Sequence, residues 1–387
     1  MIDVGFWQTV RREIGRICSR KMYLGGMIVV PVFMALFFVS LLNEGLPLKV
    51  PTAVVDLDHS TMSRSITRSL GATELIDVSR HCESYDDAMD DIRTGDIFGF
   101  FVIPDNFERD VLAGKTPTLE YYNNLTYFVP GTLTFKGFKT VAVTTSGSVV
   151  RTLLVSAGMS DTSVGPLLQP VVIQDHPIGN PWLSYAIYLS PTFIFAVLGL
   201  MIYLMTVFSI TIEIKQGTSA QWLASAHDHI TVAVTAKLLP HFVVWSVVSQ
   251  FCLALMFCYN HFPCGDLWAM SLAIELFIIA SMAFALFITC VLPNPRLAFT
   301  CCALIGILSF SFAGISFPVQ NMYGPIAIFS YLVPVRYMML IYFTVGLDAF
   351  PVYYARMYYV ALIIFPFVAA TLLWRLRRAC LKPVYVP

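Results

Sequence analysis

The sequence predicts an α-helical polytopic membrane protein, with six transmembrane helices, a re-entrant helical hairpin and an α/β extracytoplasmic domain inserted between the first and second spans. Three observations predict this fold class. Of the 387 residues, 57% are hydrophobic and only 12% are charged, and the mean hydropathy is +0.72; soluble domains carry about 25% charged residues. Apolar runs long enough to cross a bilayer recur along the chain. The charged residues gather at the two termini and in one polar stretch, residues 43–181.

The apolar runs define the spans, because a bilayer core of about 30 Å needs roughly 20 apolar helical residues. The first run is too long for a signal peptide and lacks a small-x-small cleavage site, so we expect it to remain as an anchor. The fifth is the shortest, but no charge interrupts it. The predicted spans are residues 22–42, 183–212, 230–257, 267–292, 297–315 and 352–374.

Residues 1–21 are predicted to form an amphipathic helix on the cytoplasmic membrane surface. Apolar side chains recur at helical spacing from Phe6 to Ile17, while Arg12, Arg16 and Arg20 repeat every fourth residue on another face. Five basic residues precede the first span and four follow the last, so the positive-inside rule predicts that both termini are cytoplasmic. We expect residues 182–378 to form the main transmembrane domain and residues 379–387 to form a short cytoplasmic tail.

An even number of spans is required to keep both termini on one side. The apolar segment within residues 316–347 would be a seventh span, and Pro334 and Arg336 lie near its centre. An arginine at mid-bilayer on a lipid-facing helix costs at least about 2.5 to 3.5 kcal/mol, and a proline there removes a backbone hydrogen bond. We therefore expect a re-entrant pair of half-helices that enters from the outer side and is buried in protein.

The polar stretch, residues 43–181, is predicted to form an α/β domain outside the cytoplasm. Short β-rich runs at residues 52–56, 97–103 and 118–122 alternate with helical signals. Ser84 can cap a helix that Gly95 ends, and a longer helix is expected over residues 132–159. Strands that alternate with helices favour a small parallel or mixed sheet.

Composition excludes some classes of function. Lys+Arg and Asp+Glu both number 24, so no basic surplus indicates a nucleic-acid partner. The nine cysteines form no CxxC pair, and we predict no metal or cofactor site in this chain. Cys258 and Cys264 flank a short loop on the predicted outer side, where a disulfide can persist.

The most specific segment is the predicted cytoplasmic loop at residues 213–229. Gly217 permits a sharp turn, and Thr218 can cap a short helix that presents Trp222 and Leu223 as an apolar knob for a groove on a partner. An ordinary capped loop helix is the alternative interpretation. The residues predicted to take part in coupling are Glu213, Lys215, Gly217, Thr218, Gln221, Trp222 and Leu223.

This loop resembles the E-x-x-x-G-T signature of ABC-2 type permeases, the transmembrane subunits of type V ABC exporters. In that family it is the coupling helix that docks on the nucleotide-binding subunit. Residues 54–63, V-V-D-L-D-H-S-T-M-S, and residues 99–107 resemble the ectodomain of the long-ectodomain branch, which includes multidrug efflux permeases. The re-entrant segment resembles that branch at Pro318, Met322, Pro334, Arg336 and Tyr337.

The resemblance implies an exporter of a small amphipathic drug or metabolite, located in a Gram-negative inner membrane. The chain has no G-x-x-x-x-G-K-[ST] loop, so ATP and Mg should bind to a separate ATPase subunit, and this chain should not be an enzyme itself. A homodimer or a pair with a paralogous permease is implied, surrounded by membrane lipid. The branch also works with a periplasmic adaptor and an outer-membrane channel.

Ionisable residues inside spans are functional candidates by default. Lys237 and His241 lie in the cytoplasmic half of the third span, and Glu275 lies near the middle of the fourth. Glu275 either fastens helices together or belongs to a polar substrate path. The resemblance places the export path along the second and fifth spans, where the aromatic residues are lipid-facing or line the route. The candidates are Tyr188, Phe195, Tyr203, Phe310, Phe312 and Phe317.

Two other functions remain open at this point. A permease of the same family can move a lipid or a polymer instead of a small molecule. A membrane sensor would use the inserted domain to detect a ligand, although the sequence shows no cytoplasmic output domain.

Overall fold

The chain folds into two compact units, Met1–Gly45 with Pro177–Pro387, and Leu46–His176. They are called the helical unit and the inserted unit below. The structure is a computed structural model that describes residues 2–168, 179–181, 184–260, 265–314 and 317–382. Cys264 lies outside the described residues, and with it the predicted disulfide to Cys258.

Six helices in the described part of the helical unit are long and apolar enough to cross a membrane. This number confirms the prediction, and the ends differ from it by a few residues. Two spans are interrupted: a π-helical turn, Gly25–Val29, separates α2 from α3, and a short break separates α16 from α17. The spans are α2 to α3 (Lys21–Leu24 and Val30–Leu41), α9 (Tyr185–Lys215), α11 (Ile230–Asn260), α12 (Leu267–Val291), α13 (Pro295–Phe312) and α16 to α17 (Val352–Ala370 and Leu373–Leu381).

Helices α9 and α12 form the interior of the helical unit. Of their most apolar stretches, 67% and 72% of the residues are buried, against 22% to 39% for the other four spans. Helix α9 packs against α13, α12 and α3, and α12 packs against α16, α9 and α11. The outer spans therefore leave apolar faces for lipid, as expected of a multi-pass membrane protein.

Two short helices occupy the segment for which the sequence predicts a re-entrant pair. Helix α14 (Gly324–Ser330) and helix α15 (Pro334–Ile341), which continues as a π-helical turn (Tyr342–Leu347), meet at an angle of 74°. Pro334 lies in the first turn of α15, where no backbone hydrogen bond is lost. Arg336 is buried, and its Nη1 donates to the Ala313 carbonyl at 2.9 Å. The two half-helices are thus present, and their entry from the outer side stays a prediction.

The inserted unit holds a four-stranded sheet in the order β2-β1-β3-β4. Strand β1 (Val50–Asp56) pairs in parallel with β2 (Ile76–Cys82) and β3 (Gly99–Ile103), and β4 (Glu120–Asn123) is antiparallel to β3. The sequence indicated three of these strands and missed β2. That strand lies at the sheet edge and has mostly polar, solvent-facing side chains, so it lacks the apolar signal of a buried strand.

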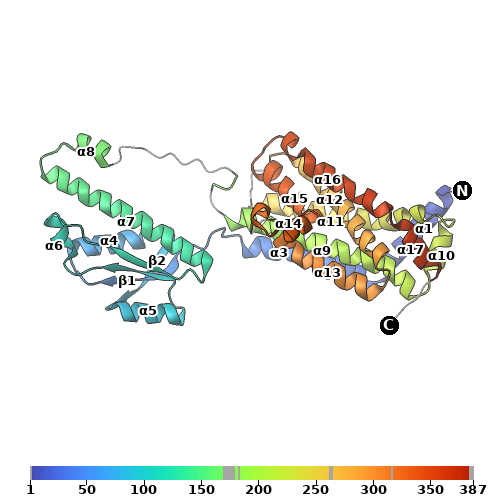
Figure 1. Cartoon of the computed structure of the whole chain (residues 1–387), viewed down its shortest axis with the longest axis horizontal. Helices are drawn as coiled ribbons and strands as arrows, with labels where there is room; N and C mark the ends of the chain where they lie inside the picture. The colour runs from blue at the N-terminus through green and yellow to red at the C-terminus, as the bar shows by residue number, and fades with distance from the viewer. Residues whose placement is uncertain (1, 169–178, 182–183, 261–264, 315–316, 383–387) are drawn as a thin grey trace. The chain divides into compact units, whose positions relative to one another are not determined.

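Helices cover both faces of this sheet (Figure 1). Helix α4 (Thr61–Gly71) and helix α7 (Phe128–Ser156) cover one face, over a core that includes Phe101 and Phe138, and helix α5 (Tyr85–Thr94) covers the other. Helix α6 (Phe107–Leu112) follows β3, and helix α8 (Asp161–Leu168) follows α7. The long helix begins four residues before the predicted start, 128 against 132.

Local side-chain contacts explain two of the sequence signals in the inserted unit. Ser84 accepts a hydrogen bond from the Asp87 amide, and Gly95 ends α5 with φ of +85°, which confirms the predicted capping. Asp56 accepts from the backbone of the turn after β1 and from the Ser63 hydroxyl at 2.7 Å. The V-V-D-x-D-x-S-x-x-S segment therefore orders the end of β1 and the start of α4.

Candidate functional site: a buried charge cluster beside α10

One end of the helical unit brings together α1 (Ile2–Ser19), α10 (Ser219–Ser225) and α17 (Figure 1). Helix α10 follows α9 after a turn at Gly217, whose φ of +68° favours glycine. Helix α1 packs along α11 and also contacts α10. Segments from the beginning, middle and end of the sequence thus meet at the loop that the sequence singles out.

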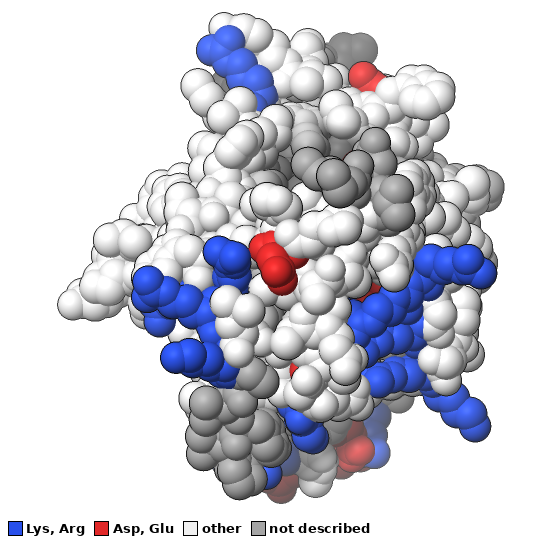
Figure 2. Space-filling view, turned by 90° about the vertical axis from the view of Figure 1, so that its right-hand side faces the viewer, with Lys and Arg blue, Asp and Glu red and all other residues white. Residues whose placement is uncertain are grey.

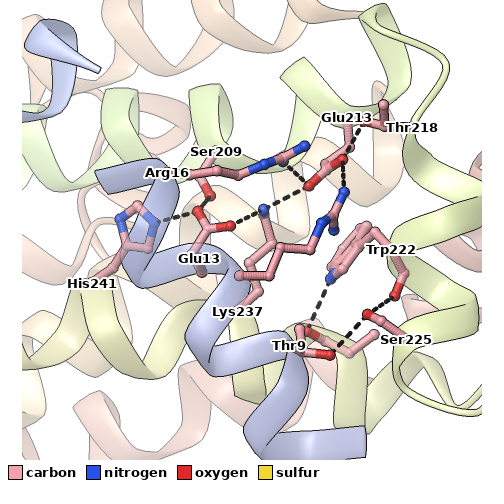
Figure 3. Close-up of polar contacts among 12 residues, drawn as sticks. Thr9, Glu13, Arg16, Ser209, Glu213, Thr218, Trp222, Ser225, Lys237 and His241 are labelled. Atoms are coloured by element: carbon pink, nitrogen blue, oxygen red, sulfur yellow. Dashed lines mark hydrogen bonds and ion pairs between the residues drawn. The ribbon is translucent and has the colours of Figure 1, made fainter. Parts of the chain in front are cut away.

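A lysine joins two carboxylates from two different helices (Figure 3). Lys237 Nζ on α11 lies 2.6 Å from Glu13 Oε2 on α1 and 3.0 Å from Glu213 Oε1 on α9. All three side chains are at most 1% exposed. A buried charge is tolerated only when it is paired and hydrogen-bonded, so this arrangement holds α1, α9 and α11 in one fixed relation.

Glu13 is a second centre of contacts. Its Oε1 accepts from the Ser209 hydroxyl at 2.9 Å and lies 2.9 Å from His241 Nε2 (Figure 3). Burial alone would raise the pKa of Glu13, but the hydrogen bond with His241 and the charge of Lys237 lower it to about 2. Glu13 is therefore a carboxylate at every physiological pH.

Glu213 connects this centre to the loop before α10. It accepts hydrogen bonds from Arg16 and from the Thr218 hydroxyl, and Arg12 Nη2 lies 3.1 Å from its Oε2. Arg12 and Arg16, which the sequence places together on one face of the helix, both turn toward the Glu213 carboxylate. Arg20 donates to Gln216 at 3.1 Å. We call Arg12, Glu13, Arg16, Glu213, Lys237 and His241 the charge cluster.

Sequence reasoning singled out Glu213, Lys237 and His241 and missed Glu13. Between Asp3 and Glu44 it is the one acidic residue, placed among the arginines of α1. It lies one helical turn after Thr9, which is also buried and contacts Ser225 of α10 at 2.9 Å. A lone carboxylate in a basic amphipathic helix was the available signal.

Helix α10 turns its apolar side chains inward. Trp222 is 0% exposed and Leu223 is 1% exposed, and Trp222 Nε1 donates to the Ala233 carbonyl of α11 at 3.3 Å. Ser219 Oγ donates to the Cys380 carbonyl of α17 at 2.8 Å. The prediction of an apolar knob for a partner is therefore wrong: Trp222 and Leu223 fill the core of this chain and fasten α10 to it.

The outer face of α10 is small and polar. Ala220, Gln221 and Ala224 are exposed there, and Lys215 and Gly217 are exposed just before the helix. Basic side chains predominate over acidic ones on this end of the molecule (Figure 2). The cluster itself holds three Lys or Arg side chains, Arg12, Arg16 and Lys237, and two Glu side chains.

A comparison with models of protein families shows to which family the chain belongs. The model of a family described as ABC-2 family transporter protein matches residues 21–375, which include the first five spans, most of the sixth and the inserted unit. The chain belongs to the ABC-2 transporter family. A search of curated proteins found no match. ABC-2 permeases are membrane components of ABC transporters, and the family normally works with an ATP-binding subunit.

The predicted path aromatics of this ABC-2 permease lie in several separate places. Phe195 and Tyr203 are fully packed in the core, where their rings lie 5.7 Å from Tyr342 and 5.2 Å from Phe284. Tyr188, Phe310 and Phe312 are partly exposed, and Phe317 is 52% exposed. The rings of the first three contact Phe343, Phe193 and Phe329, respectively.

A cleft of about 410 Å³ lies along the line where α9 and α13 meet. Its walls combine aromatic rings, hydroxyls and two cations. They are formed by Phe208, Thr211, Ile212, Lys215, Pro295, Arg296, Phe299 and Thr300. Such a lining suits a ligand with an apolar body and a polar or anionic end.

Glu275 of the ABC-2 permease contacts the neighbouring span. Its Oε1 accepts from Ser246 Oγ at 2.7 Å and from Gln250 Nε2 at 2.8 Å, both on α11. Its Oε2 is buried and has no hydrogen-bond partner among the described residues. These contacts fasten α12 to α11, and a role in substrate transport stays a prediction.

The remaining predicted residues lie around α14 and α15. Pro318 precedes a 3₁₀ turn (Val319–Asn321). The Met322 amide, just after the turn, donates to the Val319 carbonyl. Tyr337 donates its hydroxyl proton to the Tyr331 carbonyl at 2.7 Å. The described residues contain no group of three His, Cys, Asp or Glu side chains arranged to hold a metal ion.

Proposed function

We propose that this ABC-2 permease is the membrane-spanning subunit of an exporter that moves a small amphipathic drug or metabolite out of the cytoplasm or inner membrane. ATP and Mg would bind to a separate ATPase subunit. The observation that carries the proposal is the way α10 is held: its inner face is fastened to three spans, and its outer face is free of large apolar side chains. The loop, both termini and the basic end would be cytoplasmic, and the inserted unit periplasmic.

The contacts of α10 supply a mechanism for coupling. Thr218 connects its start to Glu213 of α9, Trp222 connects its middle to α11, and Ser219 connects it to α17. Because these contacts are buried, a force on the outer face of α10 cannot be absorbed by the loop alone. Closure of an ATPase dimer against two copies of this chain would therefore displace α9, α11 and α17 together.

The cleft between α9 and α13 supports an amphipathic substrate. Phe208 and Phe299 offer apolar surface, while Arg296 and Lys215 offer positive charge near one end of the spans. The same lining also suits an anionic lipid, so lipid export is the second candidate. Stimulation of ATP hydrolysis by lipid alone, with no change in drug sensitivity after deletion of the chain, would favour that candidate.

The first test is purification from the native membrane. We expect an ATPase subunit to accompany the chain, and the double substitution Gln221→Arg with Ala224→Arg to release it, because both positions are exposed on α10. Trp268→Arg is the matched control, since Trp268 is 87% exposed at the start of α12. If no ATPase accompanies the wild-type chain, the proposed function fails.

A second substitution separates coupling from assembly. Gly217 has φ of +68° and open space around it, and proline requires φ near −65°. Gly217→Pro should abolish transport while the chain still inserts and binds its ATPase. Normal transport by this variant would contradict the coupling role of the turn.

A further inference from the structure

A second cavity lies on the outside of the helical unit, away from the cleft between α9 and α13. It is a groove of about 380 Å³ between α11 and the α16 to α17 span, with α12 as its floor. Its lining is apolar apart from two threonine hydroxyls. It consists of Thr231, Val234, Thr235, Leu238, Leu239, Phe242, Ile279, Met282, Ala283, Leu286, Pro366, Ala369, Ala370 and Leu373.

Small side chains create the groove. Ala283 on the floor and Ala369 and Ala370 on one wall leave space where larger residues would close the gap between helices. Met282, Ala283 and Leu286 are at most 7% exposed, whereas Leu239 and Ile279 on the rim are 37% and 38% exposed. The groove is therefore a built recess in a lipid-facing surface, and it is open along one side.

The length of the groove matches one leaflet of a bilayer. Along α11 it runs from Thr231 to Phe242, which at 1.5 Å per residue is about 16 Å, or half of a hydrocarbon core of about 30 Å. A water molecule occupies about 30 Å³ in the liquid, and a methylene group is of similar size. The groove volume of about 380 Å³ therefore holds on the order of a dozen methylene groups. These dimensions are those of a single acyl chain.

One end of the groove lies beside a basic helix. Helix α17 begins at Leu373, a lining residue, and carries Arg375, Arg377 and Arg378 with no acidic residue. All three arginines are exposed, and Arg378 lies over the Trp374 ring at 4.7 Å. Tryptophan and arginine side chains are typical of the membrane interface, and basic residues there attract anionic headgroups.

We propose that this groove binds one anionic phospholipid of the leaflet on the α10 side, with an acyl chain between α11 and α16 and the headgroup at Arg375 of α17. The site shares no lining residue with the proposed export cleft. An acyl chain that enters the groove leaves surrounding lipid of similar polarity, so it gains little free energy. The headgroup should therefore supply most of the selectivity for one lipid over another. One arginine near an anionic lipid corresponds to about a five-fold change in affinity.

The purified full-length chain can be titrated in detergent with dimyristoyl phosphatidylglycerol or dimyristoyl phosphatidylcholine, and bound lipid counted by native mass spectrometry. We expect one phosphatidylglycerol per chain, bound about five-fold more tightly than phosphatidylcholine. Ala370→Trp should fill the groove and remove this lipid. Val368→Trp is the matched control, because Val368 is exposed on the same helix but does not line the groove.

The headgroup has its own pair of variants. Arg375→Gln should reduce the preference for phosphatidylglycerol about five-fold, and Arg356→Gln, on the opposite end of the same span, should leave it unchanged. Equal lipid binding by Ala370→Trp and Val368→Trp would overturn the proposal. So would equal binding of the two phospholipids, or a dimer that only Ala370→Trp dissociates, because the groove would then hold a second copy of the chain.

Discussion

Replacing Lys237 by methionine should remove the buried ammonium that pairs with carboxylates of both α1 and α9, while keeping most of the length of the side chain. Lys237 Nζ lies 2.6 Å from Glu13 and 3.0 Å from Glu213, with all three side chains at most 1% exposed. Removing one partner of a buried ion pair costs about 3 to 5 kcal/mol, because a charge is left uncompensated. Glu213 keeps two arginines, so the cost arises mainly at Glu13, and we expect about 3 kcal/mol.

The magnitude can be checked by heating the purified chain and following the loss of the folded, monodisperse protein. About 3 kcal/mol corresponds to a fall in midpoint of about 6 °C or more for a domain of this size. The double variant Lys237→Met with Glu13→Gln should recover most of this loss, since both buried charges are then removed. An unchanged midpoint in the single variant, or a double variant less stable than the single one, would refute the reasoning.

Three further predictions concern other parts of the chain. Because the pKa of Glu13 is lowered from 4.5 to about 2, its contribution to stability is complete above pH 4.5 and is lost as pH falls toward 2; the midpoint difference between wild type and Glu13→Gln should follow this course. Trp222→Ala should cost about 3 to 5 kcal/mol, because it empties a fully buried site, whereas the exposed Gln221→Ala should stay within about 0.5 kcal/mol in the same heating assay. Ser84→Ala should cost about 1 kcal/mol by removing the cap of α5, visible as faster amide exchange in that helix; unchanged exchange would contradict the cap.

The spans could be predicted from the sequence because each depends on a local, one-dimensional signal. About 20 apolar residues in a row are sufficient, whatever the rest of the chain does. The bent pair α14 and α15 was also predictable, because Pro334 and Arg336 disfavour a straight lipid-facing helix. Strand β2 was not, because an edge strand with Arg80 and His81 facing solvent has the composition of a loop.

The charge cluster could be predicted only in part, because its contacts join residues about 200 positions apart in sequence. Glu213 and Lys237 were conspicuous as ionisable residues at or within apolar helices. Nothing local shows that Glu13 faces them, since a basic amphipathic helix is typical of a membrane surface. The same limit applies to Trp222: periodicity shows that α10 has an apolar side, and only the packing shows that this side faces inward.

Helix α9 is a single rod of 31 residues, about 46 Å long. In its last turn, Glu213 belongs to the charge cluster. At its start, the Gly45 carbonyl accepts a hydrogen bond from the Tyr185 amide at 2.8 Å, and Asn180 is hydrogen-bonded to Ser184. Gly45, which directly precedes the inserted unit in the sequence, and Asn180, which follows it, thus both contact the start of α9. Under the proposed coupling, a displacement of α10 would therefore be carried along α9 to the residues that precede and follow the inserted unit in the sequence.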